Sequence, residues 1–392
     1  MTTTEQPGTF TCLPRERYVD DVWFERDLAE VTSRQWLYFC HVSQIPETGD
    51  ILERELGGES IIATRDGDGV VHAFYNVCRH RGYRLCDAGA SSSKQLVCPY
   101  HRWSFGLDGA LTGAPTLRDG EDFDFGDYGL KRLAVETWCG FVFVALGPEP
   151  PRHSLADVLA DAGRAFEVYE PERLKLAHEV EYEVECNWKI LLENFLECYH
   201  CPGSHPEFCL AADVPSFFKT TERGAKHFMM AHEYNWGGFP LRPGVESFTI
   251  SGERACRLSL GRTNATTSPF SLSIHPTLTA LAFVVDYGVV HQFMPISAGR
   301  SRWTAHWFVH PDAIDGEDYD VETVIGIWHA TNLQDVALCE RTQLGVNSRS
   351  FTPGPNSPKR EPMIRSALAV YHQLLGEAAE FEALTGEPFS DR

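Results

Sequence analysis

Residues 76–86 read NVCRHRGYRLC, and residues 96–111 read LVCPYHRWSFGLDGAL. Each stretch contains one cysteine followed closely by one histidine: Cys78 and His80 in the first, Cys98 and His101 in the second. Two thiolates and two imidazoles suit either a zinc ion or a Rieske-type [2Fe–2S] cluster, in which histidines replace cysteines on one iron. Zinc fingers usually pair cysteine with cysteine, whereas each stretch here supplies one of each. The pattern therefore favours the cluster.

Strand-like runs surround these two stretches. ESIIATR (59–65) and VVHAFYNV (70–77) flank Asp66-Gly67-Asp68-Gly69, a strong signal for a hairpin because Asp-Gly tolerates the positive φ angles of a tight turn. Apolar residues recur at helical intervals over 18–39, which predicts a leading helix. The proline-rich residues 147–153 read as a linker. We predict an α+β protein in three parts: an amino-terminal helical segment (1–37), a β domain with the cluster (38–150) and a catalytic domain (151–392).

A second group of possible metal ligands follows the helical run WKILLENFLECYH (188–200). His200 and His205 lie five residues apart across the end of that run. Two imidazoles and one carboxylate form the facial triad of non-haem iron oxygenases, which leaves coordination positions open for dioxygen and substrate. Zinc bound by the same donors is the competing interpretation. A neighbouring redox cluster favours iron, because zinc is redox-inert.

The carboxylate of this triad must come from another part of the chain. In the predicted helix from about 320 to 345, one face carries Ile325, Trp328, Asn332, Asp335 and Cys339. A carboxylate on a largely apolar stripe is costly unless it is paired or binds a metal. We therefore choose Asp335, with Glu340 as the runner-up.

The motifs of both halves resemble those of Rieske non-haem iron oxygenases, the oxygenase (alpha) components of multicomponent systems. The resemblance implies a helix-grip (START-like) catalytic domain with an antiparallel sheet and helices. It also implies a motif of the form N-x-x-D-x-x-H-x(4)-H with a late helical Asp, which this chain matches at Asn194, Glu197, His200, His205 and Asp335. Most such oxygenases have Asp at the position of Glu197. In the family, the residue at this position links a cluster histidine of one subunit to an iron histidine of the next. The resemblance implies that Glu197 links His101 to His200 in this way.

Glu at position 197 and the sequence around it indicate a substrate class. ENFLECYHCPGSHPE (193–207) and IWHATNLQDVALCE (327–340) resemble the subgroup that acts on quaternary ammonium compounds: choline, glycine betaine, proline betaine and carnitine. Across residues 18–360 the chain is most similar to the glycine betaine type. The resemblance implies hydroxylation of an N-methyl group, followed by loss of formaldehyde. The stretch from about 206 to 292 matches least, so an aromatic ring or a secondary metabolite stays open as substrate.

A quaternary ammonium needs aromatic faces, because it cannot donate an N–H hydrogen bond. The stretch that matches least offers several aromatic side chains, although ordinary core packing explains most of them: Phe208, Phe217, Phe218, Tyr234, Trp236, Phe239 and Tyr287. Two interpretations from other classes also stay open. The chain could be a non-catalytic Rieske electron carrier, which would not need His200, His205 and Asp335. It could also be a zinc-dependent hydrolase.

The resemblance and the composition together indicate the cofactors and partners. The chain contains no G-x-G-x-x-G or Walker sequence, so we expect electrons from NAD(P)H to arrive through a separate flavin and iron–sulfur reductase. The family implies a [2Fe–2S] cluster, mononuclear Fe(II), dioxygen as co-substrate and a head-to-tail homotrimer. A formal net charge of −21 argues against nucleic acid and anionic membranes as partners. The polar amino terminus and the lack of a long apolar run predict a cytoplasmic protein.

Overall fold

The computed structural model describes residues 10–117, 122–222, 228–230, 234–276 and 279–385. Its contacts divide the chain into two compact units: Ser33–Leu155, and Met1–Thr32 together with Ala156–Arg392. Both units mix helices or turns with antiparallel sheets, which confirms the predicted α+β class. By its contacts, the amino-terminal segment up to Thr32 groups with the larger unit.

The smaller unit is built from short antiparallel strands. Within its described residues they form sheets of order β10-β11-β2, β5-β4-β3-β6 and β7-β8-β9. The predicted hairpin is confirmed: β4 pairs with β5, and the Oδ1 atom of Asp66 accepts the N–H groups of Asp68 and Val70 in the turn. The bounds are β2 (Leu37–His41), β3 (Asp50–Leu56), β4 (Glu59–Arg65), β5 (Val71–Tyr75), β6 (Gly89–Ser92), β7 (Leu96–Val97), β8 (Ser104–Phe105), β9 (Leu111–Gly113), β10 (Ala134–Trp138) and β11 (Phe141–Ala145).

The leading helix is shorter than predicted. Residues 16–34 form a series of short helical segments: α1 (Glu16–Val19), α2 (Asp21–Arg26), the π-helical turn Asp27–Val31 and the 3₁₀ turn Thr32–Arg34. The prediction of helix for 37–39 is wrong, because these residues belong to the fully buried strand β2, which pairs with β11. A short, continuous apolar run cannot be assigned to helix or strand from periodicity alone.

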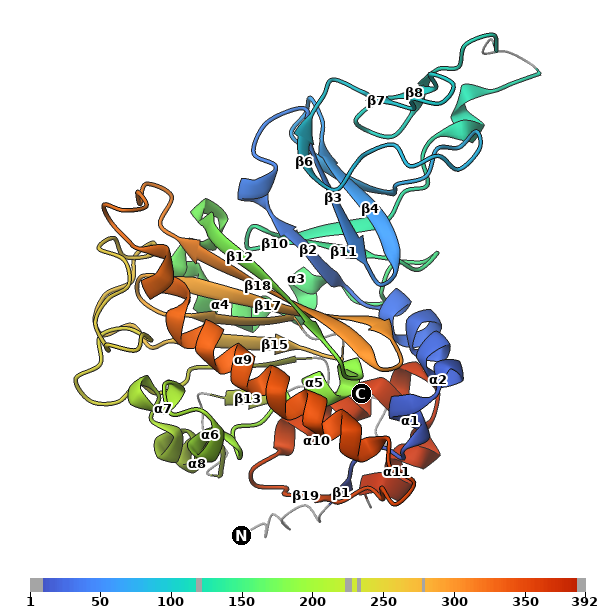
Figure 1. Cartoon of the computed structure of the whole chain (residues 1–392). Helices are drawn as coiled ribbons and strands as arrows, with labels where there is room; N and C mark the ends of the chain where they lie inside the picture. Colours follow the sequence, from blue (N-terminus) through green and yellow to red (C-terminus); the bar gives the residue numbers. More distant parts are fainter. Residues whose placement is uncertain (1–9, 118–121, 223–227, 231–233, 277–278, 386–392) are drawn as a thin grey trace. The chain divides into compact units, whose positions relative to one another are not determined.

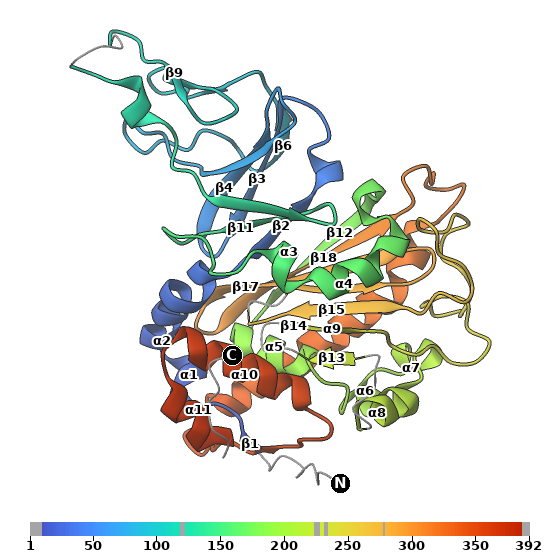
Figure 2. The same ribbon diagram turned by 180° about the vertical axis from the view of Figure 1, so that it is seen from behind.

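The larger unit is a seven-stranded antiparallel sheet of order β12-β18-β17-β16-β15-β14-β13 with helices on its faces. The long helix α9 crosses one face (Figure 1), and α4 packs against β15 on the other (Figure 2). This arrangement confirms the predicted antiparallel sheet with helices. The bounds are β12 (Lys175–Val184), β13 (Phe228–Met230), β14 (Tyr234–Gly237), β15 (Phe270–Ile274), β16 (Thr279–Phe283), β17 (Gly288–Ser297), β18 (Arg300–Val309), α3 (Leu155–Val158), α4 (Ala160–Phe166), α5 (Trp188–Phe195), α6 (Cys201–Ser204), α7 (Phe208–Ala211), α8 (Val214–Glu222), α9 (Val321–Val346), α10 (Pro362–Leu374) and α11 (Ala378–Thr385), with the pair β1 (Phe10–Thr11) and β19 (Pro355–Asn356).

Helix α9 confirms the predicted late helix. Its amino terminus is capped by Asp320, whose carboxylate accepts the N–H of Thr323. The predicted apolar face is buried, and the carboxylate of Asp335 lies on that face. Helix α9 packs against α5 and strand β12 of the sheet, so its buried face carries the charged Asp335 among apolar side chains. In the described part of the chain, no helix is both long and apolar enough to cross a bilayer.

A buried ion pair fixes the amino-terminal segment to the larger unit. The ammonium group of Lys189 in α5 bonds to the carboxylate of Asp27, and both residues are at most 1% exposed. Asp27 also accepts hydrogen bonds from the indole of Trp188 and the hydroxyl of Tyr371 in α10. Three elements distant in sequence therefore share one carboxylate. The buried side chain of Arg17 also bonds to Glu377, just before α11, and to Glu380 within it.

Replacing Asp27 with alanine is expected to lower the free energy of unfolding by about 3–5 kcal/mol, because Lys189 would keep a buried charge without its partner. Thermal or denaturant unfolding measures this. The matched control is Asp21→Ala, on the exposed side of α2, for which we expect a change below about 0.5 kcal/mol. Equal stabilities of the two variants would contradict the role given to the pair.

Candidate metal sites

The two cysteine loops of the smaller unit share one backbone design. The N–H of Cys78 donates to the carbonyl of Tyr83, and the N–H of Gly82 donates back to the carbonyl of Cys78. The second loop repeats this pattern, with Cys98 N–H on the carbonyl of Trp103 and Arg102 N–H on that of Cys98. Gly82 and Arg102 both have positive φ, which each tight loop requires. The pairing β7-β8 and the core beneath hold both cysteines buried.

The two histidines of these loops lie beside each other. The ring centroids of His80 and His101 are 4.5 Å apart, and the indole of Trp103 stacks on His80 at 5.0 Å. The Nδ1 atom of His101 is buried and has no hydrogen-bond partner among the described residues, as expected of a nitrogen that faces a metal. Burial raises the pKa of Cys78, and the adjacent Cys98 thiol adds to this shift.

The spread of these four side chains fits a two-iron cluster better than a single ion. Tetrahedral zinc would hold its ligand atoms about 3.3–3.8 Å apart. In the structure, however, no three of the ligand atoms of Cys78, His80, Cys98 and His101 lie within 4.8 Å of one another. A [2Fe–2S] cluster places thiolates on one iron and imidazoles on the other, so the four need not converge.

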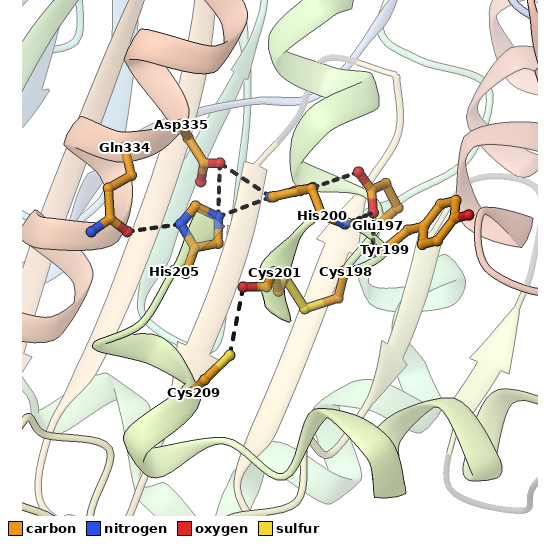
Figure 3. The surroundings of a disulfide bond; sticks show 9 residues. All are labelled: Glu197, Cys198, Tyr199, His200, Cys201, His205, Cys209, Gln334 and Asp335. Carbon is orange, nitrogen blue, oxygen red and sulfur yellow. Dashed lines mark hydrogen bonds and ion pairs between the residues drawn. A yellow bond between two sulfur atoms is a disulfide. The ribbon is translucent and has the colours of Figure 1, made fainter. Parts of the chain in front are cut away.

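In the larger unit, three predicted side chains meet at one point (Figure 3). The Nε2 atoms of His200 and His205 are 2.9 Å apart, and Oδ1 of Asp335 lies 3.2 Å from the first and 3.0 Å from the second. Ligand atoms held about 2.1 Å from a metal at right angles are about 3.0 Å apart. The separations therefore match three neighbouring corners of an octahedron.

The hydrogen bonds behind the two imidazoles define their tautomers. The Nδ1–H of His200 donates to Glu197 at 2.5 Å, and the Nδ1–H of His205 donates to Gln334 at 2.8 Å. Both Nε2 atoms then carry lone pairs that face the Oδ1 atom of Asp335, which has no well-formed hydrogen bond among the described residues. Three lone pairs directed at one point require a cation. The arrangement fits a divalent metal ion.

Without a metal, a proton takes part of that role. Burial disfavours protonation of His200, but its contacts with Asp335 and Glu197 outweigh burial and raise its pKa to about 9. Burial acts in the opposite direction on Asp335, where contacts with His200 and His205 keep the pKa of the carboxyl below its ordinary value. The two shifts are reciprocal: the carboxylates favour the charged imidazole of His200, and the imidazoles favour the ionised carboxyl of Asp335.

Glu197 contacts His200 without the helical geometry that the sequence suggested. Helix α5 ends at Phe195, so the helix predicted over 188–200 does not reach the two residues. The carboxylate instead folds over the turn and accepts the N–H groups of Tyr199 and His200 as well as the ring N–H. Glu197 therefore fixes both the backbone and the ring of His200.

Gln334 is a contact of the site that the sequence reasoning missed. Its side-chain oxygen accepts the Nδ1–H of His205, and its amide nitrogen donates to Glu207 at 2.7 Å. Gln334 directly precedes Asp335 in α9, so one turn of this helix supplies a proposed ligand and the support of another. The sequence signal for this contact is weak: Gln334 is a polar residue next to Asp335, which lies on the buried face of the helix.

Replacing Gln334 with leucine is expected to weaken iron binding at the mononuclear site about 10- to 100-fold, because the ring of His205 would lose the acceptor that orients it. Anaerobic Fe(II) titration measures the affinity. Gln334→Glu keeps an acceptor for the ring and should retain more of the affinity than leucine does. Unchanged affinity in Gln334→Leu would remove the positioning role.

A cavity of about 150 Å³ opens beside His200, His205 and Asp335. Asn194 lies on its wall, and the Oδ1 atom of Asn194 is buried with no hydrogen-bond partner among the described residues. Aromatic rings form much of the remaining wall: Phe195, Phe208, Phe217, Phe239 and Trp328. Three of these are among the aromatic residues considered from sequence, whereas Phe195 and Trp328 come from the helices α5 and α9.

The runner-up carboxylate, Glu340, lies elsewhere on α9. It accepts the backbone N–H of Glu185 at 3.2 Å and does not line the cavity. The structure also joins Cys198 to Cys201 in a disulfide beside His200, which the sequence reasoning did not anticipate. Cys201 gathers with His200 and His205 within 4.8 Å, but its sulfur is bonded to Cys198, so Asp335 is the better third ligand.

Comparison with protein families places this geometry in a known class. The Rieske [2Fe–2S] domain matches residues 35–133, and the catalytic domain of ring-hydroxylating alpha subunits matches residues 171–377. The chain belongs to the ring-hydroxylating alpha subunits with a Rieske domain. It is therefore the oxygenase component of a Rieske non-haem iron monooxygenase, with a [2Fe–2S] cluster, a mononuclear iron and a separate reductase component.

Individual relatives cover nearly the whole chain. The glycine betaine monooxygenase oxygenase subunit of Pseudomonas aeruginosa is 36% identical over 370 residues, 89% of this chain and 85% of the relative. The carnitine monooxygenase oxygenase subunit of Escherichia coli K12 is 35% identical over 341 residues, 86% of this chain and 85% of the relative. A crystal structure of the quaternary ammonium Rieske monooxygenase CntA with L-carnitine shares the fold, with 23% identity, a TM-score of 0.73 and coverage of 95% and 96%.

Proposed function

We propose that this oxygenase hydroxylates an N-methyl carbon of a quaternary ammonium compound such as glycine betaine. One observation carries the proposal: aromatic side chains line the cavity next to the three proposed ligands, and the acidic residues Glu197, Asp213 and Asp335 line it as well. A methylated ammonium cannot donate an N–H hydrogen bond, so aromatic faces and nearby negative charge attract it. The names of the relatives support the same substrate class.

The proposed ligand sets follow from the two sites. Cys78, His80, Cys98 and His101 hold the cluster; His200, His205 and Asp335 hold the iron. When bound, the iron supplies open coordination positions for dioxygen and the cluster supplies electrons. Glu197 keeps the Nδ1–H of His200 in place, which leaves Nε2 free to bind the metal. Asn194 lines the cavity, and its buried side-chain oxygen has no hydrogen-bond partner among the described residues.

The electron path we propose crosses a subunit boundary. Glu197 would link His200 to His101 of the partner subunit, in a head-to-tail homotrimer that closes as a ring. The half-buried carboxylate of Glu197 already accepts three N–H groups from its own chain. A charged acceptor of this kind can also take a donor from a neighbour.

The overall reaction balances with one dioxygen and two electrons. The substrate R₃N⁺–CH₃ reacts with O₂, two electrons and two protons to give R₃N⁺–CH₂OH and water. The C–N bond of this product then breaks, which releases formaldehyde, a proton and the tertiary amine R₃N. The purpose of the cavity walls is to hold the cation with one methyl carbon toward the ligands and to exclude bulk water.

A formaldehyde-release screen tests the proposal. The protein is combined with NADH, a surrogate reductase and a panel of methylated ammonium compounds, each paired with its neutral carbon isostere; choline is paired with 3,3-dimethylbutan-1-ol. We expect formaldehyde in a 1:1 ratio to NADH for at least one cation, and binding of the isostere about 2- to 30-fold weaker. Absence of formaldehyde from every cation, with both metal sites loaded, would overturn the proposal.

A further inference from the structure

The disulfide between Cys198 and Cys201 closes a four-residue ring that contains His200. Figure 3 shows the bond directly below the imidazole, on the turn that joins α5 to α6. The disulfide therefore spans the residue proposed as an iron ligand, and Cys198 directly follows Glu197.

The turn has few other constraints. Between the end of α5 and the start of α6, the N–H groups of Tyr199 and His200 donate to the carboxylate of Glu197. On the other side, α6 is only four residues long, and the carbonyl of His200 accepts the N–H groups of Gly203 and Ser204. A covalent link across such a short, partly exposed turn removes conformations that would move the ring of His200 away from its partners.

Both cysteines also line the cavity beside the ligands. Cys198 is partly exposed, whereas Cys201 is only 5% exposed, so a small oxidant or an external thiol reaches Cys198 first. In reducing compartments, pairs of this kind are transient or redox-sensing and seldom structural. Their position next to an oxygen-activating centre exposes them to any peroxide that forms there.

We propose that Cys198 and Cys201 are a reversible dithiol–disulfide pair that reacts with peroxide and, as the disulfide, holds His200 in position to bind the metal. The dithiol–disulfide reaction requires only the two cysteines, whereas the effect on metal affinity rests on the proposed iron site. The pair would couple the redox state of the surroundings to occupancy of the mononuclear site.

The chemistry balances with hydrogen peroxide as the oxidant. The Cys198 thiol attacks H₂O₂, the O–O bond breaks, and a sulfenic acid and water form. The Cys201 thiol then displaces the hydroxyl group from the Cys198 sulfur, which gives the S–S bond and a second water. A dithiol reductant reverses the change by thiol–disulfide exchange, begins at the more exposed Cys198 sulfur, and is itself oxidised to a disulfide.

The experiment uses the full chain with its cluster in place and the mononuclear site cleared by a chelator. One portion is treated with one equivalent of H₂O₂ and another with a phosphine reductant, and both are then desalted. Alkylation followed by peptide mass analysis reports the state of Cys198 and Cys201, and an anaerobic Co²⁺ titration reports the metal affinity. We expect a Cys198–Cys201 disulfide after peroxide and Co²⁺ affinity about tenfold weaker in the reduced protein.

Two variants separate the pair from its surroundings. The double variant Cys198→Ser/Cys201→Ser should bind Co²⁺ like the reduced protein after either treatment. Cys209→Ser removes a nearby thiol, whose Sγ contacts the carbonyl of Cys201, and should behave like the unaltered chain. Equal alkylation of Cys198 and Cys201 after both treatments would overturn the dithiol chemistry.

If the oxidised and reduced proteins bind Co²⁺ with affinities within twofold of each other, the disulfide does not position His200 for metal binding, and that part of the proposal is overturned. Failure to bind Co²⁺ in either state would overturn the proposed iron site together with that hold. The alkylation result then decides the dithiol chemistry separately, so the two failures remain distinguishable.

Discussion

Asp335→Ala is expected to leave the mononuclear site without iron and to reduce turnover about 100-fold or more, while the cluster stays in place. The carboxylate is the only anionic member of the proposed ligand set, and both Nε2 atoms lie 3.0–3.2 Å from its Oδ1 atom. Removing it deletes one ligand and leaves two neutral imidazoles, a larger loss than the 10- to 100-fold typical of residues that only support a ligand. Iron and acid-labile sulfide analysis, with the spectrum of the reduced cluster, measures the result.

Glu340→Gln is the matched control for Asp335→Ala. It removes a carboxylate from the same helix, but that carboxylate bonds to the backbone of Glu185 away from the cavity. We expect its iron content and turnover to stay within about twofold of the unaltered chain. Loss of iron from Glu340→Gln with retention in Asp335→Ala would reverse the assignment.

Glu197→Gln is expected to keep both metal sites filled but to slow transfer of electrons from cluster to iron by at least about tenfold. The amide can still accept the Nδ1–H of His200, so the ring keeps its orientation. It lacks the negative charge that, on the proposed electron path, would strengthen the hydrogen bonds of Glu197 to His200 and to His101 of the partner subunit. Stopped-flow re-oxidation of the reduced cluster, with substrate and dioxygen present, measures the rate.

Glu197→Asp separates charge from length. It keeps a carboxylate at the position where most related oxygenases carry Asp, although the side chain is one methylene shorter. We expect it to retain more of the electron-transfer rate than Gln does. Normal cluster re-oxidation in Glu197→Gln would remove the bridging role and leave Glu197 as a residue that shapes the turn.

The parts of the site that the sequence predicts are those with short-range signals. The cysteine loops are recognisable because cysteine and histidine recur two or three residues apart, and the structure gives both loops the same backbone pattern. Asp335 is predictable because it lies on one buried face of a long helix, where period and burial agree over many residues. The hairpin around Asp66 was equally local.

The parts that the sequence does not predict depend on long-range contacts or on local competition. Gln334 matters only because His205 faces it from another element, which no spacing reveals. Trp328 lies on a stripe that reads as ordinary core, yet it lines the cavity. Residues 37–39 became strand because a partner strand was available, and helix α5 ended before Glu197. The spacing of Cys198 and Cys201 was a usable signal, but their bond depends on the turn.

A single-turnover experiment tests whether the two iron sites together oxygenate a methylated ammonium compound. The protein, with both metal sites loaded, is reduced chemically, freed of reductant, and mixed with dioxygen and a methylated ammonium substrate in the absence of any reductase. We predict re-oxidation of the cluster together with up to one formaldehyde per mononuclear iron, and no formaldehyde from the Asp335→Ala variant. Re-oxidation of the cluster without formaldehyde, in protein whose mononuclear site is full, would contradict this prediction.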